Sequence, residues 1–153
     1  MCEYCGCQSL ESIRILTEEH DQVVDLIGAA RSAHRQGELG TLIEKCQAMV
    51  AVLGPHTHIE EAGLFPAMAR DFPDQIAALV SDHRHIEAVL ARALDGSAAG
   101  DPQWPAQVEA IFVLLREHIL REQDGVFPAA LATLTTDQWA ALDELRLAGA
   151  SEA

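Results

Sequence analysis

A short segment that occurs twice in the chain most constrains what the chain can fold into. Residues 56–67 read HTHIEEAGLFPA and residues 118–129 read HILREQDGVFPA. Aligned without a gap, the two copies share a histidine, a glutamate four positions later, a glycine and the run Phe-Pro-Ala. Side chains four residues apart lie on the same face of an α-helix. Each copy therefore predicts a helix that turns a histidine and a carboxylate in one direction, beside apolar residues.

The spacing of apolar residues predicts helices along the rest of the chain and gives no convincing strand. Apolar side chains recur at intervals of three and four residues, and runs of β-branched residues are short. Helices are expected over about 9–36, from about 41 through the first repeat, from Pro73 to the stop at Gly96, through the second repeat, and over about 136–148. Gly54-Pro55 predicts a kink just before His56, and residues 96–105 are expected to form a linker.

Four long helices and a short fifth one favour an all-α fold, an antiparallel up-and-down four-helix bundle. The length, 153 residues, suffices for one domain with a core of its own. The expected division is a cysteine-rich segment over 1–8, the bundle over 9–132, and a C-terminal helix and tail over 133–153.

The charge balance argues against several classes of partner. The chain has 24 acidic and 10 basic residues, a formal net charge of −14. Such a surface repels phosphate backbones and anionic lipids, so neither nucleic acid nor a membrane is an expected partner. No apolar run reaches the length of a membrane span, and the first residues, MCEYCGCQSL, lack the regions of a signal peptide. We expect a cytoplasmic protein.

Two further histidines complete a pattern of inward polar groups. His20 and His83 each lie on the apolar stripe of a separate helix and are flanked by acidic residues, in EEHD and SDHR. A lone inward histidine is more often a hydrogen-bonded core residue than a metal ligand. Four of them, with glutamate at the same offset in both repeats, favour metal binding, because uncompensated charge in a core is costly.

The number of these groups favours two metal ions. A structural zinc ion takes four ligands in all, so four imidazoles and two carboxylates are too many for one. Two metals, each with two histidines and both sharing two bridging carboxylates, use every group. Imidazole suits iron, copper and zinc, and carboxylate moves the choice towards iron or manganese. The leading assignment is a pair of non-haem iron ions with an additional oxo, hydroxo or water bridge.

The combined motifs resemble those of the hemerythrin or HHE cation-binding family. The residues that carry the resemblance are His20, His56 with Glu60, His83, and His118 with Glu122, with Phe-Pro after each pair. The resemblance covers roughly residues 9–132 and implies a four-helix bundle with a non-haem di-iron site. It implies that His20 and His56 bind one metal, that His83 and His118 bind the other, and that Glu60 and Glu122 bridge them. Members of this family carry oxygen, sense oxygen or iron, or take part in peroxide, nitric oxide and iron-repair chemistry.

Two positions depart from the oxygen-carrying hemerythrins. The carriers have a fifth histidine one turn after the third-helix histidine, and this chain has Glu87 there. Their last bridging acid is an aspartate five residues after the histidine, whereas here Glu122 follows His118 by four. Glu87 is either a further metal ligand or an outer, solvent-facing residue. An anionic ligand would favour ferric iron and fill the open position that reversible oxygen binding requires, so this departure favours redox chemistry.

Several residues near the motifs have secondary expectations. Gly63 and Gly125, one heptad past the repeat histidines, either leave room for a small ligand or allow close helix contact. His58 and His85 are expected to point away from the metals, and His34 is expected to be exposed.

Three of the four cysteines lie in the N-terminal run CEYCGC. Cys2, Cys5 and Cys7 have a spacing that suits a soft metal or disulfide exchange, although three thiolates are one short of a zinc site. The alternative is a frayed tail without a chemical role. If the segment folds over the bundle, a thiol could reduce the centre or couple it to a redox partner protein. Cys46 is expected to be a buried, inert thiol.

Three functions compete at this point. The first is a di-iron oxidoreductase, peroxidase-like or catalase-like, that acts on peroxide or oxygen. The second is a non-catalytic sensor, carrier or store for oxygen, nitric oxide or iron. The third is a bundle with a purely structural metal, against which the number of inward ligands argues. Glu87 favours the first of these.

Overall fold

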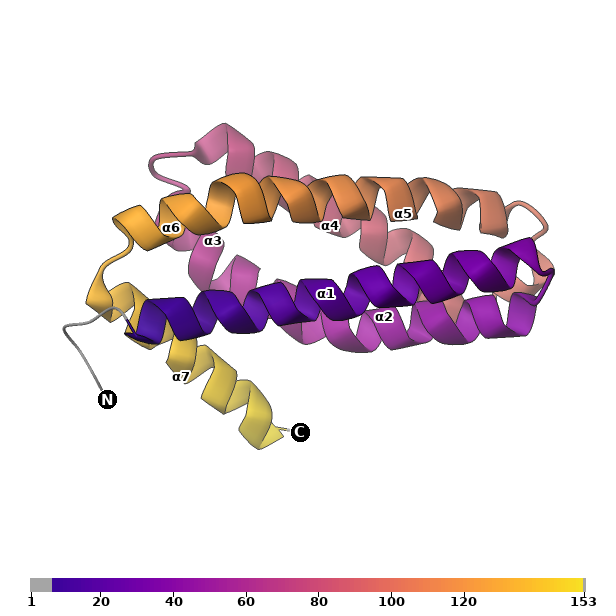
Figure 1. The fold of residues 1–153 in the computed structure, drawn as a ribbon, viewed down its shortest axis with the longest axis horizontal. Coiled ribbons are helices and arrows are strands. Elements are labelled where there is room, and N and C mark those ends of the chain that lie inside the picture. The colour runs from indigo at the N-terminus through magenta and orange to yellow at the C-terminus, as the bar shows by residue number, and fades with distance from the viewer. Residues whose placement is uncertain (1–6, 153) are drawn as a thin grey trace.

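The chain is all-helical over residues 7–152, the part that this computed structural model describes, which confirms the expected all-α class. Its elements are α1 (Cys7–Arg35), α2 (Leu39–Ile59), η1 (Glu60–Leu64), α3 (Phe65–Met68), α4 (Pro73–Leu94), η2 (Ala98–Gly100), α5 (Trp104–Arg121), η3 (Glu122–Val126), α6 (Phe127–Thr133) and α7 (Thr136–Glu152). The long helices α1, α2, α4 and α5 lie along the length of the molecule, and α7 projects from the end where α1 begins (Figure 1). No helix in the described part of the chain is long and apolar enough to cross a bilayer.

Two glycines end helices as the sequence predicts. Gly37 follows α1 with a φ of 73° and Gly96 follows α4 with a φ of 83°, a conformation that suits glycine because it has no Cβ. The amide of Gly37 donates to the carbonyl of His34 (3.1 Å) and the amide of Glu38 to that of Ala33 (2.9 Å). The chain thereby reverses within a few residues and α2 packs along α1 (Figure 1).

Two sequence-based boundaries differ from the structure, while the kink at Gly54-Pro55 stays a prediction. α2 continues through Pro55, and because Ala51 and Pro55 are exposed, the carbonyl that Pro55 leaves unpaired can bond water. The linker over 96–105 is shorter than expected, since α5 begins at Trp104, whose buried indole N–H donates to the carbonyl of Val89 (3.0 Å). The last helix continues to Glu152 rather than ending near residue 148.

A π-helical turn follows each of the two helices that carry the repeat histidines: η1 follows α2, and η3 follows α5. In η1 the amide of Phe65 donates to the carbonyl of Glu60, and in η3 the amide of Phe127 donates to that of Glu122. The proline after each phenylalanine has no N–H to donate and clashes with a regular helical turn. The wider turn accommodates that proline, and such turns often occur at functional sites.

The apolar core is divided into two layers by a polar layer. One apolar cluster, around Trp104 and Phe112, fills the half of the bundle towards Gly37 and Gly96. The other, around Phe65, Phe127 and Trp139, fills the half where α7 packs. Along α1 the two clusters meet between Leu16 and Val23, so His20 lies at the boundary. The three other core histidines occupy the same boundary on α2, α4 and α5.

Candidate metal centre

Six polar side chains from six elements meet at the boundary between the apolar clusters. His20 on α1, His56 on α2, His83 on α4 and His118 on α5 are between 1% and 5% exposed. Glu60 and Glu122 open the π-helical turns η1 and η3 and are 0% exposed. All six residues predicted as the principal ligands therefore lie together in the core.

The six groups form two overlapping clusters that share both glutamates. One contains His20, His56, Glu60 and Glu122, the other contains His83, His118, Glu60 and Glu122, and the ligand atoms of each lie within 4.8 Å of one another. Each histidine directs Nε2 at a glutamate oxygen. The distances are 3.2 Å from His20 to Glu122, 3.2 Å from His56 to Glu60, 3.4 Å from His83 to Glu60 and 3.0 Å from His118 to Glu122.

The other ring nitrogen of every histidine is held by a second residue. Nδ1–H of His20 donates to Gln123 (3.0 Å), that of His56 to Glu19 (3.1 Å), that of His83 to Glu61 (2.8 Å) and that of His118 to Asp82 (3.1 Å). Because an oxygen acceptor requires a proton on Nδ1, Nε2 of each ring faces the centre, where Nε2 of His83 and that of His118 lie 3.1 Å apart. Histidines that bind metals are oriented in this way by an acceptor behind the ring.

Each of these acceptors is adjacent in sequence to one residue of the cluster but bonds a histidine on another helix. Glu19 precedes His20 but bonds His56, and Asp82 precedes His83 but bonds His118. Glu61 follows Glu60 but bonds His83. The four helices are therefore linked in a closed cycle around the site, in which each half of the chain repeats the pattern of the other.

Three of the four acceptors are carboxylates, and each lies next to an arginine. Glu61 accepts a hydrogen bond from Arg84, and Asp82 accepts one from Arg121 (2.6 Å). Glu19 forms an ion pair with Arg146 of α7 (3.9 Å). The fourth acceptor, Gln123, is a neutral amide at the position that Glu61 occupies in the first repeat. The arginines offset the negative charge that the carboxylates bring towards the centre.

The phenylalanine of each Phe-Pro pair packs against a histidine of the cluster. Phe65 stacks on His83 with ring centroids 5.6 Å apart, and Phe127 stacks on His20 at 5.4 Å. These two phenylalanines thus fix the planes of two core imidazoles.

The two glutamates form a tightly coupled pair. Burial and the charge of Glu122 raise the pKa of Glu60 well above its ordinary value. Burial also acts to raise the pKa of Glu122, but contacts with Glu60, His118 and His20 outweigh it and hold that pKa well below its usual range. Without a cation, one proton must serve both carboxylates.

The donor atoms of the cluster fit a metal centre. Nε2 of His20 and His56 and all four oxygens of Glu60 and Glu122 form no hydrogen bond. Buried polar atoms are rarely left without a partner, and charged ones are found paired or bound to metals. Imidazole nitrogens and carboxylate oxygens on two overlapping clusters are the ligand types of a carboxylate-bridged pair of transition metals.

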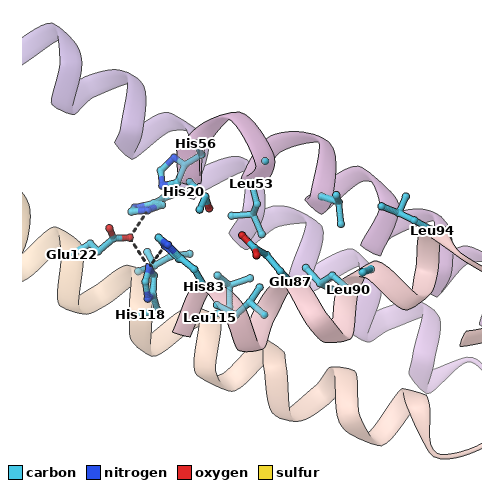
Figure 2. A pocket seen from close by; sticks show the side chains of 16 residues that line it. His20, Leu53, His56, His83, Glu87, Leu90, Leu94, Leu115, His118 and Glu122 are labelled. Carbon is cyan, nitrogen blue, oxygen red and sulfur yellow. Dashed lines mark hydrogen bonds and ion pairs between the residues drawn. The ribbon is translucent and has the colours of Figure 1, made fainter. Parts of the chain in front are cut away.

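Glu87 lies beside the cluster, not within either group of ligand atoms. Its side chain is 49% exposed, and its carboxylate accepts a hydrogen bond from Arg84 (2.9 Å). It does line a cavity of about 160 Å³ that opens from the histidines between α2, α4 and α5. Figure 2 shows Glu87 in this cavity between Leu53 and Leu90.

The repeat glycines lie within the π-helical turns and do not face the cluster. Neither Gly63 nor Gly125 lines the cavity at the histidines. A Cβ on Gly63 would overlap a methyl of Leu142, so this glycine allows α7 to approach closely. A Cβ on Gly125 would meet nothing within 4 Å. Close helix contact is thus the role of Gly63 alone.

The remaining histidines lie outside the cluster. His58 and His85 are exposed, two residues from His56 and His83. His34 is half-buried, contrary to expectation, because Nδ1 donates to Glu109 of α5 (3.1 Å).

Of the cysteines, Cys2 and Cys5 lie outside the described residues. Cys7, at the start of α1, is disulfide-bonded. Cys46 is a buried free thiol, and burial raises its pKa to about 12, as an inert thiol requires.

The sequence reasoning missed the second layer of the site. The acidic flanks of His20 and His83 were visible as EEHD and SDHR, and they supply Glu19 and Asp82. Their partners could not be read from the sequence, because each bonds a histidine on another helix. Arg146 gave no signal, since it lies well beyond the end of the second repeat at Ala129.

A buried set of histidines and glutamates with unpaired donor atoms defines an all-helical cation-binding protein. The chain matches the family model of the hemerythrin HHE cation-binding domain over residues 11–130. It belongs to that family. Comparison of the chain with curated proteins and with solved structures gave no match.

Proposed function

We propose that the protein is a hemerythrin-like di-iron protein that carries out redox chemistry on peroxide or oxygen. In this proposal the four long helices form the antiparallel bundle, which spans residues 9–132. His20 and His56 bind one iron, His83 and His118 bind the other, and Glu60 and Glu122 bridge them. The two carboxylates would offset only part of the positive charge of two iron ions. An oxo or hydroxo group bound to both ions would offset more of it.

The observation that carries the proposal is the cluster of unpaired donor atoms at the inner end of a cavity. The two iron ions, when bound, would supply the electrons that cleave an O–O bond. The protein residues orient the imidazoles through Glu19, Glu61, Asp82 and Gln123, and the apolar walls limit the access of water. Because Glu87 is paired with Arg84, we assign it to the cavity wall rather than to the ligand set.

The test is metal content and peroxide reactivity of protein produced with iron available. We expect about two iron ions per chain, an optical spectrum typical of an oxo-bridged ferric pair, and a change in that spectrum with hydrogen peroxide. Oxygen released on adding peroxide would indicate disproportionation. A spectrum that changes with oxygen and returns fully under argon, without peroxide turnover, would instead identify the carrier or sensor alternative.

The chain offers matched controls for this experiment. His56→Ala and His83→Ala remove ligands, whereas His58→Ala and His85→Ala remove exposed histidines two residues away on the same helices. The first pair of variants should lose iron and peroxide reactivity, and the second pair should keep both. Equal behaviour of the two pairs would contradict the ligand assignment.

A further inference from the structure

The cavity at the cluster extends well beyond the metal ligands. From the histidines it runs between α2 and α4 with α5 as its floor, past Leu53 and Leu90 to Leu94 (Figure 2). His83 and Leu94 are both on α4, and at a rise of 1.5 Å per residue they are about 16 Å apart along the helix. Leu94 is 56% exposed, so the far end of the cavity reaches the surface.

The walls of this extension are apolar. Val50 and Leu53 come from α2, Ile86 and Leu90 from α4, and Leu115 and Ile119 from α5. Among the described residues, the polar side chains that line the cavity besides the clustered histidines and Glu122 are Thr57 and Glu87. The Glu87 carboxylate is already paired with Arg84. A ligand can therefore make polar contacts at the inner end and mainly apolar contacts along the rest.

The cavity is larger than oxygen or hydrogen peroxide requires. A single water needs only about 10–15 Å³ of such space, whereas an apolar cavity of roughly 150 Å³ binds benzene. The volume here is about 160 Å³, part of which the metals would fill. What remains matches an alkyl group of roughly four to six carbons, and the elongated shape suits a linear chain.

We propose that this cavity binds a small organic hydroperoxide, with its oxygen end at the histidine and glutamate cluster and a linear alkyl chain of about four to six carbons along the leucines. That the ligand carries a hydroperoxide group at its inner end rests on the proposed function. Binding of the alkyl chain does not, because the apolar walls are present whether or not metal is bound.

The first test uses linear 1-alkanols from ethanol to octanol as unreactive probes. Binding to the metal-free and the iron-loaded protein is followed through the methyl NMR signals of Val50, Leu53 and Leu90. Burial of each methylene should tighten binding about fourfold up to hexanol, after which the gain should stop at the end of the cavity. Affinity that does not depend on chain length, or hexanol that does not bind, would overturn the inference.

Variants on α4 locate the binding. Ala91 lines the cavity, and Ala88 is an exposed residue of the same helix that does not. Ala91→Leu should weaken hexanol binding at least tenfold, and Ala88→Leu should leave it unchanged. Leu53→Gln, a change of similar size at a half-buried position, should weaken it as well. Equal effects of the two alanine variants would place the alkanol elsewhere and overturn the inference.

A rate comparison separates this inference from the proposed function. Iron-loaded protein is given hydrogen peroxide or pentyl hydroperoxide with a dithiol as donor, so that ROOH and the dithiol yield ROH, water and the cyclic disulfide. A kcat/KM higher for pentyl hydroperoxide than for hydrogen peroxide would support both the inference and the proposed function, provided that Ala91→Leu abolishes the difference and Ala88→Leu does not. Turnover of hydrogen peroxide without alkanol binding would overturn only the inference. Graded alkanol binding without turnover of either peroxide would support the cavity and overturn the proposed function.

Discussion

Each core histidine is held at Nδ1 by an acceptor from a neighbouring helix, and its Nε2 is directed at a glutamate of the centre. For His83, these are Glu60 and Glu61, which are adjacent in sequence. Neighbouring residues on a helix point in directions about 100° apart, so one faces the centre and the other reaches behind the ring. Gln123 is the exception among the acceptors, and it makes the surroundings of His20 less anionic than those of the other three histidines.

A change at Glu87 tests the assignment of that residue to the cavity wall. Glu87→Gln should leave the metal content unchanged, because its half-exposed carboxylate bonds Arg84 and lies outside the ligand clusters. Glu61→Gln, which also alters a partner of Arg84, should weaken metal binding by about 10–100-fold because it removes the carboxylate that orients His83. Elemental analysis after dialysis against a graded series of chelator concentrations measures both. Loss of metal from Glu87→Gln to the level of His83→Ala would make Glu87 a ligand.

Among the elements, the two π-helical turns show how similar sequences acquire different roles. Both start at a glutamate of the centre and end before a Phe-Pro pair. α7 packs on η1, with Leu142 against Gly63, whereas a Cβ on Gly125 of η3 would meet nothing within 4 Å. The C-terminal helix is thus in contact with the turn that carries Glu60, and α7 breaks the internal symmetry of the bundle.

The two repeat glycines provide a matched pair for measuring that contact. Gly63→Ala should lower the free energy of unfolding by about 1–3 kcal/mol, because the new methyl group would overlap Leu142 and force α7 to shift. Gly125→Ala should be neutral or stabilising by up to about 1 kcal/mol, since its Cβ meets nothing and alanine favours helix. Denaturant unfolding measures both. Equal effects at the two positions would contradict the close packing of α7 on η1.

Arg146 connects α7 to the metal centre through Glu19 and His56. Its side chain is 16% exposed, its Nε has no hydrogen-bond partner, and burial lowers its pKa. Arg146→Gln should speed metal loss to a chelator by about tenfold, because Glu19 would then lack its counter-charge and hold His56 less firmly.

The control for Arg146 is Arg14→Gln on α1. Arg14 is exposed and pairs with Glu11 and Glu18 on its own helix, contacts that contribute little. Metal loss should be unchanged in this variant. If the two variants lose metal at the same rate, α7 has no part in holding the site.

In the whole molecule, a polar layer separates two apolar clusters, and a bound cation would pair the polar groups of that layer. Six buried donor atoms without partners would otherwise weaken the fold. The arginines beside Glu19, Glu61 and Asp82 offset outer charge but do not reach the centre. The stability of the bundle and the occupancy of the site are therefore linked.

Removal of metal should lower the melting temperature substantially. Metal at about 1,000 times its dissociation constant stabilises the fold by roughly 4 kcal/mol, which for a chain of this size corresponds to about 8–16 °C. Calorimetry before and after chelation measures the shift. A variant with alanine at both Glu60 and Glu122 should show no shift on chelation. A wild-type protein that melts at the same temperature in both states would contradict a metal-linked fold.

Much of the helical pattern and the inner set of six residues followed from local rules. Apolar spacing predicted the long helices, and glycines with positive φ ended two of them. The start of α5 was misread, because the sequence does not show that the indole of Trp104 is buried. The π-helical turns were missed, although the prolines after Phe65 and Phe127 were a signal for them.

The sequence by itself determined which side chains face inward, because a helix with a fixed period places residues four apart on one face. Only the tertiary structure decided which of them meet. The cycle of acceptors joins residues of different helices, and the contact of α7 depends on a missing Cβ at Gly63. Glu87 shares the helix and the stripe of His83, yet its carboxylate pairs with Arg84 and belongs to neither cluster of ligand atoms. Such pairings arise from distances between helices, which no local rule encodes.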